Sequence, residues 1–354
     1  MKKLLLFPFA GCMLALSCHR PNNNNNTTTV TETQVINDFV AKVVLPQYQA
    51  LQDKATALNN AVNTFNTTPN GANLSAARTA WRETRACWEN CEGFLIGPVE
   101  DDNYDPNMDT WPVDYLQLDS FIANSSSFSV GTVAALSQSL RGFHPLEYIL
   151  WGKDGNVAVE DISSRQHQYM VALAQDVLNN CTALNLSWVA SGGNFQVQFL
   201  TAGTGSTRYT TKKDALLALA AGMAEICGEV GEGKMLEPFQ LMDSTKTESP
   251  FSHNSMTDFT NNIKGAQNVY LCTVNGANGS SLSNLVSQKN LSLDNKIKTQ
   301  FAAAIAALGN VTVSFESALY TQRTQLQTAM TAITNLEETL DGDLKTFIIT
   351  YVKD

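Results

Sequence analysis

A histidine and a glutamate stand three positions apart, as His144 and Glu147, in the segment LRGFHPLEYILWG at residues 140–152. Imidazole and carboxylate groups together are ligands that iron, zinc and manganese accept in proteins. Pro145 disfavours a helical conformation of the residue before it, and Gly142 tolerates almost any backbone geometry. The pattern therefore predicts that a helix breaks here and restarts with His144 as its N-cap, Pro145 as its first residue and Glu147 as its third.

The same two residues also have a purely structural interpretation. A histidine cap with a glutamate three positions later resembles a capping box, which serves only to start a helix. A lone HxxE spacing does not decide between a cap and a binding site. The segments before and after it favour the binding site.

The segment WRETRACWENCEGFLIGP, at residues 81–98, places charge among tryptophans. Helical spacing puts Arg85 and Glu92 on one stripe with two tryptophans, and Glu89 lies close enough to join them. Buried charges are costly unless they pair with each other or bind a ligand. This helix is therefore predicted to face the same site as the histidine.

An acidic loop, DDNYDPNMDTWPVD, follows at residues 101–114. Acidic loops are usually just solvated. This one lies between the two motif segments, so one or two of its carboxylates could reach the site. Asp109 is the one that we expect there.

The elements that must position these residues are helices. Apolar residues recur at intervals of three and four along most of the chain, and two long amphipathic helices are predicted over residues 162–184 and 315–340. A short stretch at 195–200 is ambiguous between strand and helix. The fold class is predicted to be all-α, with helices packed as bundles. Further helices should begin near the following residues: Val35, a cap at Asn73 or Ser75, Asp214 and Leu293.

Glycine-rich loops after residue 191 predict a boundary between an N-terminal helical bundle, residues 33–190, and a C-terminal one, residues 191–354. Short echoes between the parts support two four-helix-bundle-like halves related by a degenerate internal repeat. EGFLIGP at 92–98 reappears as EGKMLEP at 232–238, and LRGFH is echoed by IKGAQ, in which Gln267 takes the place of the histidine. Only one site of this kind is therefore expected.

The first 17 residues have the features of a lipoprotein signal peptide. Two lysines precede an apolar run that is too short to span a bilayer, and ALSC at 15–18 resembles a lipobox, so Cys18 is the predicted lipidation site. A cleaved secretory peptide with an incidental cysteine is the alternative. The polar residues that follow predict a disordered tether over 18–32. We expect a bacterial envelope protein, held by its lipid on the periplasmic face or at the cell surface.

Charge and cysteine usage exclude some functions. The formal net charge is −10 and basic residues do not cluster, which argues against nucleic acid as a partner. No CxxC pair exists. The cysteines beyond Cys18 could include a disulfide, between Cys87 and Cys91 or to Cys181, but small buried hydrophobes are the favoured interpretation.

Together with the downstream segment ESPFSHNSMTDFTNNIKGAQNVY, at residues 248–270, these motifs resemble the imelysin family, whose members carry a GxHxxE signature. The resemblance runs from about residue 33. It implies an all-helical envelope protein with a site between two bundle-like halves. The family includes proteins first described as insulin-cleaving membrane proteases and others implicated in iron uptake. Carried over residue by residue, the resemblance adds Ser249, Ser252 and Asp258 as site residues from the second half.

The predicted function is binding of a divalent or ferric metal ion, iron first and zinc second, by an envelope protein of iron uptake. An iron chelate and an envelope transport protein are the other expected partners. The predicted metal ligands are His144, Glu147, Glu92 and Asp109. The predicted lining residues are Arg85, Glu89, Ser249, Ser252 and Asp258.

The alternative function is a metallopeptidase of the insulin-cleaving type. Zinc peptidases commonly take two histidines from an HExxH helix, and the chain's histidines do not form that motif. Metal binding without cleavage is therefore favoured. A serine enzyme that uses Ser252 and His253 is disfavoured because no GxSxG turn is present. A purely structural envelope protein stays as a further alternative.

Overall fold

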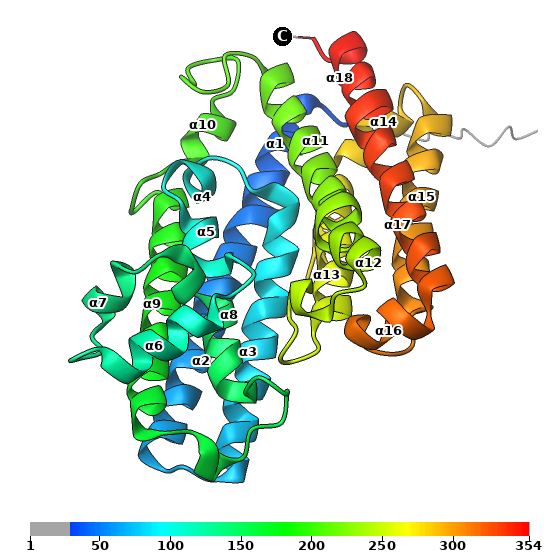
Figure 1. Ribbon diagram of the computed structural model, residues 1–354. Coiled ribbons are helices and arrows are strands. Elements are labelled where there is room, and N and C mark those ends of the chain that lie inside the picture. The colour runs from blue at the N-terminus through cyan, green and yellow to red at the C-terminus, as the bar shows by residue number, and fades with distance from the viewer. Residues whose placement is uncertain (1–28, 354) are drawn as a thin grey trace, which may run out of the picture.

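The computed structural model describes residues 29–353, in which helices form two bundles side by side (Figure 1). The predicted signal peptide, Cys18 and most of the predicted tether lie outside the described residues. The end of that tether lies inside them. Thr31 caps the first helix, because its hydroxyl accepts a hydrogen bond from the backbone N–H of Gln34, and the helix begins at Glu32.

Three long helical stretches build the first bundle. Helix α1 (Glu32–Phe39) continues through the π-helical segment η1 (Val40–Val44) into α2 (Leu45–Thr67). Helix α2 packs against α3 (Gly71–Cys91) and α9 (Ser164–Trp188). Short elements between α3 and α9 cover the remaining side: η2 (Glu92–Phe94), α4 (Pro98–Asp101), α5 (Tyr104–Asp109), α6 (Tyr115–Asn124), α7 (Val130–Ala134), η3 (Gln138–Leu140), α8 (Phe143–Trp151) and η4 (Val159–Asp161).

Four helices build the second bundle, and each of them packs against two of the others. They are α11 (Lys212–Gly228), α13 (Ser255–Leu271), α15 (Leu291–Gly309) and α17 (Arg323–Glu338). The remaining helical elements are α10 (Gln196–Leu200), η5 (Glu229–Lys234), α12 (Leu236–Leu241), η6 (Ser244–Lys246), α14 (Leu282–Ser287), α16 (Phe315–Thr321), η7 (Thr339–Leu344) and α18 (Lys345–Tyr351). The all-α prediction is confirmed.

Several local predictions differ from the structure. The ambiguous stretch at 195–200 forms helix α10. A short antiparallel hairpin lies elsewhere in the chain and consists of β1 (Thr273–Val274) and β2 (Ala277–Asn278). The long helix expected over 315–340 is interrupted at Gln322, which lies between α16 and α17. The boundary predicted after residue 190 falls in the connection between α9 and α10. That boundary and the internal repeat stay predictions.

The two bundles meet where α3 and η2 pack against α13. Two glycines allow the close approach. A Cβ on Gly265 would lie 2.5 Å from the carbonyl oxygen of Asn90, and one on Gly93 would lie 2.5 Å from the carbonyl carbon of Gly265. Any side chain at either position would force the helices apart. The polar stripe of α3 is thereby held against the second bundle.

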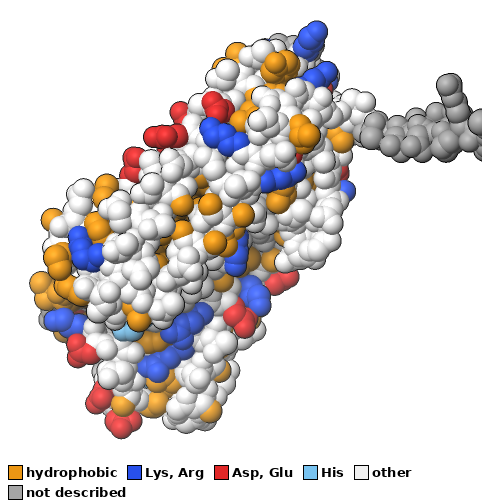
Figure 2. Space-filling view, turned by 90° about the vertical axis from the view of Figure 1, so that its right-hand side faces the viewer, with side chains coloured by type: hydrophobic (Ala, Val, Ile, Leu, Met, Phe, Trp, Pro, Cys, Tyr) orange, Lys and Arg blue, Asp and Glu red, His pale blue; other side chains and the backbone are white. Residues whose placement is uncertain are grey.

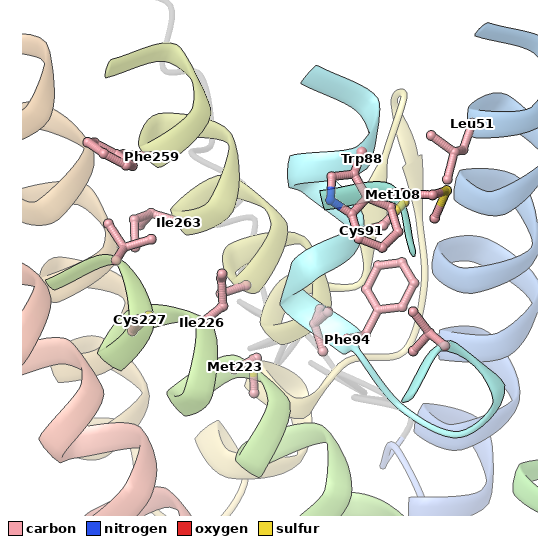
Figure 3. Packing of buried hydrophobic residues seen from close by; sticks show 14 of the residues in the cluster. Leu51, Trp88, Cys91, Phe94, Met108, Met223, Ile226, Cys227, Phe259 and Ile263 are labelled. Carbon is pink, nitrogen blue, oxygen red and sulfur yellow. The ribbon is translucent and has the colours of Figure 1, made fainter. Parts of the chain in front are cut away.

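Hydrophobic cores flank this contact on both sides (Figure 3). Trp88, Phe94 and Met108 pack towards α2, while Ile226 and Ile263 pack within the second bundle. The five cysteines of the described part are free, and four of them are buried: Cys91, Cys181, Cys227 and Cys272. They therefore act in the structure as small core residues.

The outer surface carries charges of both signs. On the face in Figure 2, acidic and basic side chains are spread among hydrophobic ones, and a small group of Lys and Arg side chains lies beside a histidine on its lower half. Between residues 29 and 353, no helix combines the length and the apolar character that crossing a membrane requires.

Candidate metal site

Helix α8 carries the HxxE pair, and it begins two residues earlier than predicted. Gly142, not His144, is the N-cap, and it has a φ of 89°. A Cβ there would lie 2.2 Å from the carbonyl oxygen of Met108, so only glycine fits. His144 is consequently the second helical residue, and Glu147 follows it by one turn on the same face. The prediction that the two side chains meet is confirmed, although the cap was wrong.

The imidazole of His144 lies between two carboxyl groups. Its Nδ1 is 3.3 Å from Oε2 of Glu147, and its Nε2 is 3.0 Å from Oδ1 of Asp109. The second contact does not have hydrogen-bond geometry, so Nε2 is a buried polar atom without a partner. Burial and Arg85 lower the pKa of His144, but its contacts with Asp109 and Glu147 outweigh them and raise it to about 9.

Glu147 connects α8 to the loop that precedes α13 in the second bundle. Its Oε1 accepts hydrogen bonds from the backbone N–H groups of Phe251 (3.2 Å) and Ser252 (2.7 Å) and from the Ser252 hydroxyl (2.7 Å). The other oxygen faces the imidazole. Glu147 is thus fully occupied in orienting His144, and the hydroxyl of Ser252 donates to a carboxylate rather than to a histidine.

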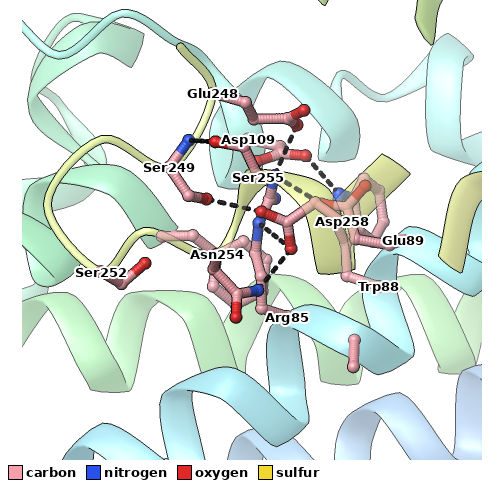
Figure 4. Close-up of polar contacts among 12 residues, drawn as sticks. Arg85, Trp88, Glu89, Asp109, Glu248, Ser249, Ser252, Asn254, Ser255 and Asp258 are labelled. Atoms are coloured by element: carbon pink, nitrogen blue, oxygen red, sulfur yellow. Dashed lines mark hydrogen bonds and ion pairs between the residues drawn. The ribbon is translucent and has the colours of Figure 1, made fainter. Parts of the chain in front are cut away.

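Arg85, from the middle of α3, lies at the centre of the acidic groups (Figure 4). Its guanidinium pairs with Asp109, Glu89 and Glu248, the last at 2.6 Å from Nη2 to Oε1. Asp109 also accepts a hydrogen bond of 2.6 Å from the indole of Trp88. Burial raises the pKa of Asp109, but Arg85 and then His144 outweigh it and hold that pKa well below its usual range. Asp109 is therefore ionised.

Lys234, at the end of η5, brings a second buried cation from the other bundle. Its Nζ lies 2.9 Å from Oε2 of Glu92 and 2.9 Å from Oε1 of Glu248. The amide of Asn262 donates to Oε2 of both Glu89 and Glu92, at 2.5 and 2.7 Å. Burial raises the pKa of Glu89 and that of Glu92 well above the ordinary value of a glutamate, although nearby cations such as Lys234 act against this.

The second bundle also supplies a polar cluster around Asp258. Its carboxylate accepts hydrogen bonds from the Ser249 hydroxyl (2.7 Å) and the Asn254 amide (2.6 Å), and it lies 3.9 Å from Nε of Arg85. Burial raises the pKa of Asp258 to about 7, although Arg85 acts against this. Ser249 and Asp258 therefore border the Arg85 side of the site.

The site contains more acid than permanent base. Six buried carboxyl groups surround two permanent cations, Arg85 and Lys234. The carboxyl groups are those of Glu89, Glu92, Asp109, Glu147, Glu248 and Asp258. If all six were ionised, the excess would be 6 − 2 = 4 negative charges beside one histidine. Excess buried negative charge of this kind needs protons or a bound cation.

Two sets of side chains in residues 29–353 offer ligand atoms within 4.8 Å of one another, and both include Asp109. One set is Asp109, His144 and Glu248, and the other is Glu89, Glu92 and Asp109. In the first set, Nε2 of His144 and Oε2 of Glu248 are buried without hydrogen-bond partners. One imidazole nitrogen with carboxylate oxygens is a donor set that suits iron, manganese or zinc.

A cavity of about 220 Å³ leads from the surface to this first set. His144 and Glu248 both line it. The other lining residues are Pro112, Val113, Tyr115, Lys153, Asp154, Ser244, Thr245, Thr247, Pro250, Phe251, His253 and Glu316. An ion or a small chelate that entered this cavity would therefore meet an imidazole and a carboxylate at once.

The structure brings the predicted metal ligands and lining residues into one region; Cys18, the predicted lipidation site, lies outside the described residues. Sequence reasoning missed Glu248, although it is the first residue of the segment used for the family resemblance. It also missed Lys234. In the proposed repeat, Lys234 stands where the first copy has the buried Phe94, and a lysine at an apolar position was a sign of a buried charge.

Comparisons with known proteins agree with this architecture. The family model of imelysin matches residues 44–341. Iron-regulated protein A of Synechococcus elongatus is 32% identical over 313 residues, which cover 87% of this chain and 84% of that protein.

Two crystal structures are also similar. One is of a protein assigned as an iron-regulated protein A precursor from Parabacteroides distasonis, with a TM-score of 0.82, 25% identity, and coverage of 89% of this chain and 94% of that one. The other is of an imelysin-like protein from Psychrobacter arcticum, with a TM-score of 0.73 and 13% identity, covering 88% and 94%. The second likeness concerns the fold alone.

Proposed function

The chain belongs to the imelysin family, and from that premise we propose that it binds an iron ion, or another transition metal ion, through Asp109, His144 and Glu248. One observation carries the proposal. Two of these three groups present buried ligand atoms without a hydrogen-bond partner, and both line a cavity open to the outside. Unpartnered buried polar atoms are rare in folded proteins and call for an explanation. A bound cation would satisfy both atoms.

The residues divide into ligands and supporting groups. Nε2 of His144 and oxygens of Asp109 and Glu248 would hold the ion, which supplies positive charge to an acid-rich interior. Glu147 acts behind His144 as its positioning residue, in place of the ligand role expected from the sequence. Such supporting groups usually fix the ring and its tautomer. Arg85 keeps Asp109 ionised and in place, while Ser249 and Asp258 support Arg85.

Iron is the preferred ion because relatives of this chain carry the name iron-regulated protein A. We propose that the protein takes part in iron uptake in the bacterial envelope, anchored through a lipid on Cys18, and passes its ion to an envelope transport protein. An iron chelate small enough for the cavity is an alternative form of the ligand.

Isothermal titration calorimetry with Fe²⁺, kept anaerobic, and separately with Zn²⁺ tests the binding proposal. The protein should bind one ion, and His144→Ala should lose it. His167→Ala is the matched control, because His167, on α9, is also buried but packs against Phe65 of α2, so binding should persist. Failure of the unaltered protein to bind either ion, or equal binding by His144→Ala, would refute the proposal.

The family is also classed with peptidases, and the same preparation tests that alternative. Incubation with metal and an unfolded protein substrate should give no cleavage. Cleavage that requires metal and is lost in Glu147→Ala would support the metallopeptidase instead. Binding of iron or zinc without cleavage would favour the uptake role.

A further inference from the structure

A group of exposed apolar side chains lies at one end of the second bundle. Leu291, the first residue of α15, is 60% exposed, while Ile349 and Tyr351, in the last turn of α18, are 57% and 49% exposed. The two helices are neighbours there, because a groove of about 450 Å³ is lined by residues of 290–296 on one side and of 343–351 on the other. Apolar side chains that gather on a surface, unlike single ones, often mark a binding surface.

Two lysines accompany this group in the sequence. Lys289 and Lys353 are both exposed, and neither forms an ion pair with a carboxylate of residues 29–353, whereas Lys296 on α15 pairs with Asp343. The chain as a whole has a formal net charge of −10. An anionic surface therefore repels most of the molecule and attracts the end that carries these two lysines.

The described chain begins at this same end. The side-chain amide of Gln288, two residues before the cap of α15 at Asn290, donates a hydrogen bond of 3.0 Å to the carbonyl oxygen of Val30. Figure 1 shows α14 and α18 together at the top of the second bundle. Cys18 precedes Thr29 by 29 − 18 = 11 residues, so covalent geometry would keep a lipid-bearing Cys18 within roughly 40 Å of this end.

We propose that this end of the second bundle lies on the anionic lipid surface that holds the chain, an inference that rests on the proposed lipid anchor. The contacting residues are Leu291, Ile349 and Tyr351 with Lys289 and Lys353, and we call them the lipid-facing end. Aliphatic and tyrosine side chains are favourable at the boundary between headgroups and acyl chains, and lysines are attracted to anionic headgroups. The contact is peripheral, since it is made by side chains near helix ends.

This orientation would turn the proposed metal site away from the bilayer. Helix α15 starts at the lipid-facing end and is about 28 Å long, and α16, the next helix, carries Glu316, which lines the cavity. Figure 1 shows α16 and α18 at opposite ends of the second bundle. An ion or a recipient protein would then reach the cavity from the aqueous side.

Fluorescent labelling of the full chain, purified from the envelope, tests this orientation. Thr350→Cys on α18 and Thr321→Cys on α16 each receive a thiol-reactive dye. They are matched positions, because both threonines are exposed and each hydroxyl donates to the carbonyl oxygen four residues earlier. In vesicles of phosphatidylethanolamine and phosphatidylglycerol that contain a quenching, spin-labelled headgroup, the dye at position 350 should lose most of its emission and the dye at 321 should keep it. The unaltered protein, treated alike, gives the background from its own cysteines.

Substitutions within the lipid-facing end identify the side chains that make the contact. Leu291→Ser with Ile349→Ser, in the chain labelled at position 350, should restore most of the emission, and both residues are exposed, so the fold should persist. Leu241→Ser with Met242→Ser is the matched control, since it removes two comparably exposed side chains at the end of α12 and should leave the quenching unchanged.

The charge contribution is tested in the same way. Lys289→Glu with Lys353→Glu should also restore emission at position 350 in these vesicles, because it replaces attraction to phosphatidylglycerol by repulsion. In vesicles of neutral phosphatidylcholine alone, the same change should make no difference.

Other results would overturn the inference. Equal quenching at positions 350 and 321, or stronger quenching at 321, would show that this end does not face the lipid. A dimer in gel filtration whose dye at 350 is shielded from an aqueous quencher without vesicles would assign the surface to a second copy of the chain. Mass spectrometry shows separately whether Cys18 carries a lipid, and calorimetry shows whether metal binds, so failure of the proposed function is told apart. A chain without lipid that also lacks quenching at 350 would overturn both the anchor and this inference.

Discussion

Glu147 fixes the ring of His144 from one side only: Oε2 lies 3.3 Å from Nδ1, while Oε1 accepts three hydrogen bonds from the loop at residues 251–252. The carboxylate is therefore anchored in the second bundle and holds an imidazole of the first. With Nδ1 held in this way, Nε2 is the nitrogen left to bind a metal ion.

Glu147→Gln should weaken metal binding because an amide cannot hold the imidazole as the carboxylate does. Loss of such a supporting group costs roughly 10-fold to 100-fold in affinity. Calorimetry with Zn²⁺ measures the effect. Asp119→Asn is the control. Asp119 accepts a hydrogen bond from Tyr148, which lies on α8 beside Glu147, but Asp119 does not touch His144. Equal affinities for Glu147→Gln and the unaltered protein would show that Glu147 does not position the ligand.

Glu248→Gln should lower the affinity for metal at least as much, by about 100-fold or more, because it removes a charged ligand rather than a supporting group. Glu237→Gln, at an exposed position on α12, should leave binding unchanged. Both variants are compared by competition with a coloured zinc chelator. Unaltered binding in Glu248→Gln would remove Glu248 from the ligand set.

Metal affinity should rise with pH. The pKa of His144 is about 9, because its contacts with Asp109 and Glu147 outweigh burial and Arg85, so below pH 9 the ion must displace a proton. The affinity should therefore increase about tenfold per pH unit between pH 6 and 8 and level off above pH 9. Calorimetry in buffers of different ionisation enthalpy should detect at least one released proton. A flat profile over this range would mean that His144 is not a ligand.

The stability of the metal-free protein should show the opposite trend. The pKa of His144 is higher in the folded chain than the value near 6.5 of an unfolded histidine, so its contribution is complete below that value and is lost as the pH rises through about 9. Thermal unfolding between pH 6 and 9 measures this loss. Saturating Zn²⁺ should reverse the trend, since bound metal replaces the proton.

Gly265→Ala should destabilise the protein by about 1–3 kcal/mol, because the added methyl group would lie 2.5 Å from the carbonyl oxygen of Asn90 and push α13 away from α3. Metal affinity should fall as well, since Arg85 on α3, which pairs with Asp109, and Glu248 in the loop before α13 shift apart. Gly342→Ala is the control: its added Cβ meets nothing within 4 Å, and stability should stay equal or rise. Chemical denaturation would contradict the prediction if the two variants behaved alike.

The sequence predicted helices well where one apolar stripe faces a core, as in α9, but less well where caps compete. Asn70, rather than Asn73 or Ser75, caps α3, since its side chain accepts the hydrogen bond from the N–H of Asn73. At α8, the contact of Gly142 with Met108 decided the start. That contact joins residues distant in sequence, so local propensity could not show it.

Within the site, sequence reasoning found residues that share an element or a motif, such as His144 with Glu147 and Arg85 with Glu89. It could not find which carboxylates end beside the imidazole. Glu248 comes close to His144 because the loop before α13 contacts α3: Arg85 pairs with Glu248, and Arg82 donates a hydrogen bond to the carbonyl oxygen of Ser252. Sequence reasoning also gave Glu147 a ligand role, because it could not show that N–H groups of this loop occupy one oxygen of Glu147.

The tight seam at Gly93 and Gly265 has a consequence for how cargo would leave. Backbone atoms pack closely there, so the proposed metal site is assembled before any ion arrives, and loading would require little rearrangement. Release of the ion cannot then depend on the two helical bundles moving apart. A recipient would have to draw the ion out through the mouth of the cavity, helped by acid that returns a proton to the imidazole or by a reductant that weakens the ion's hold.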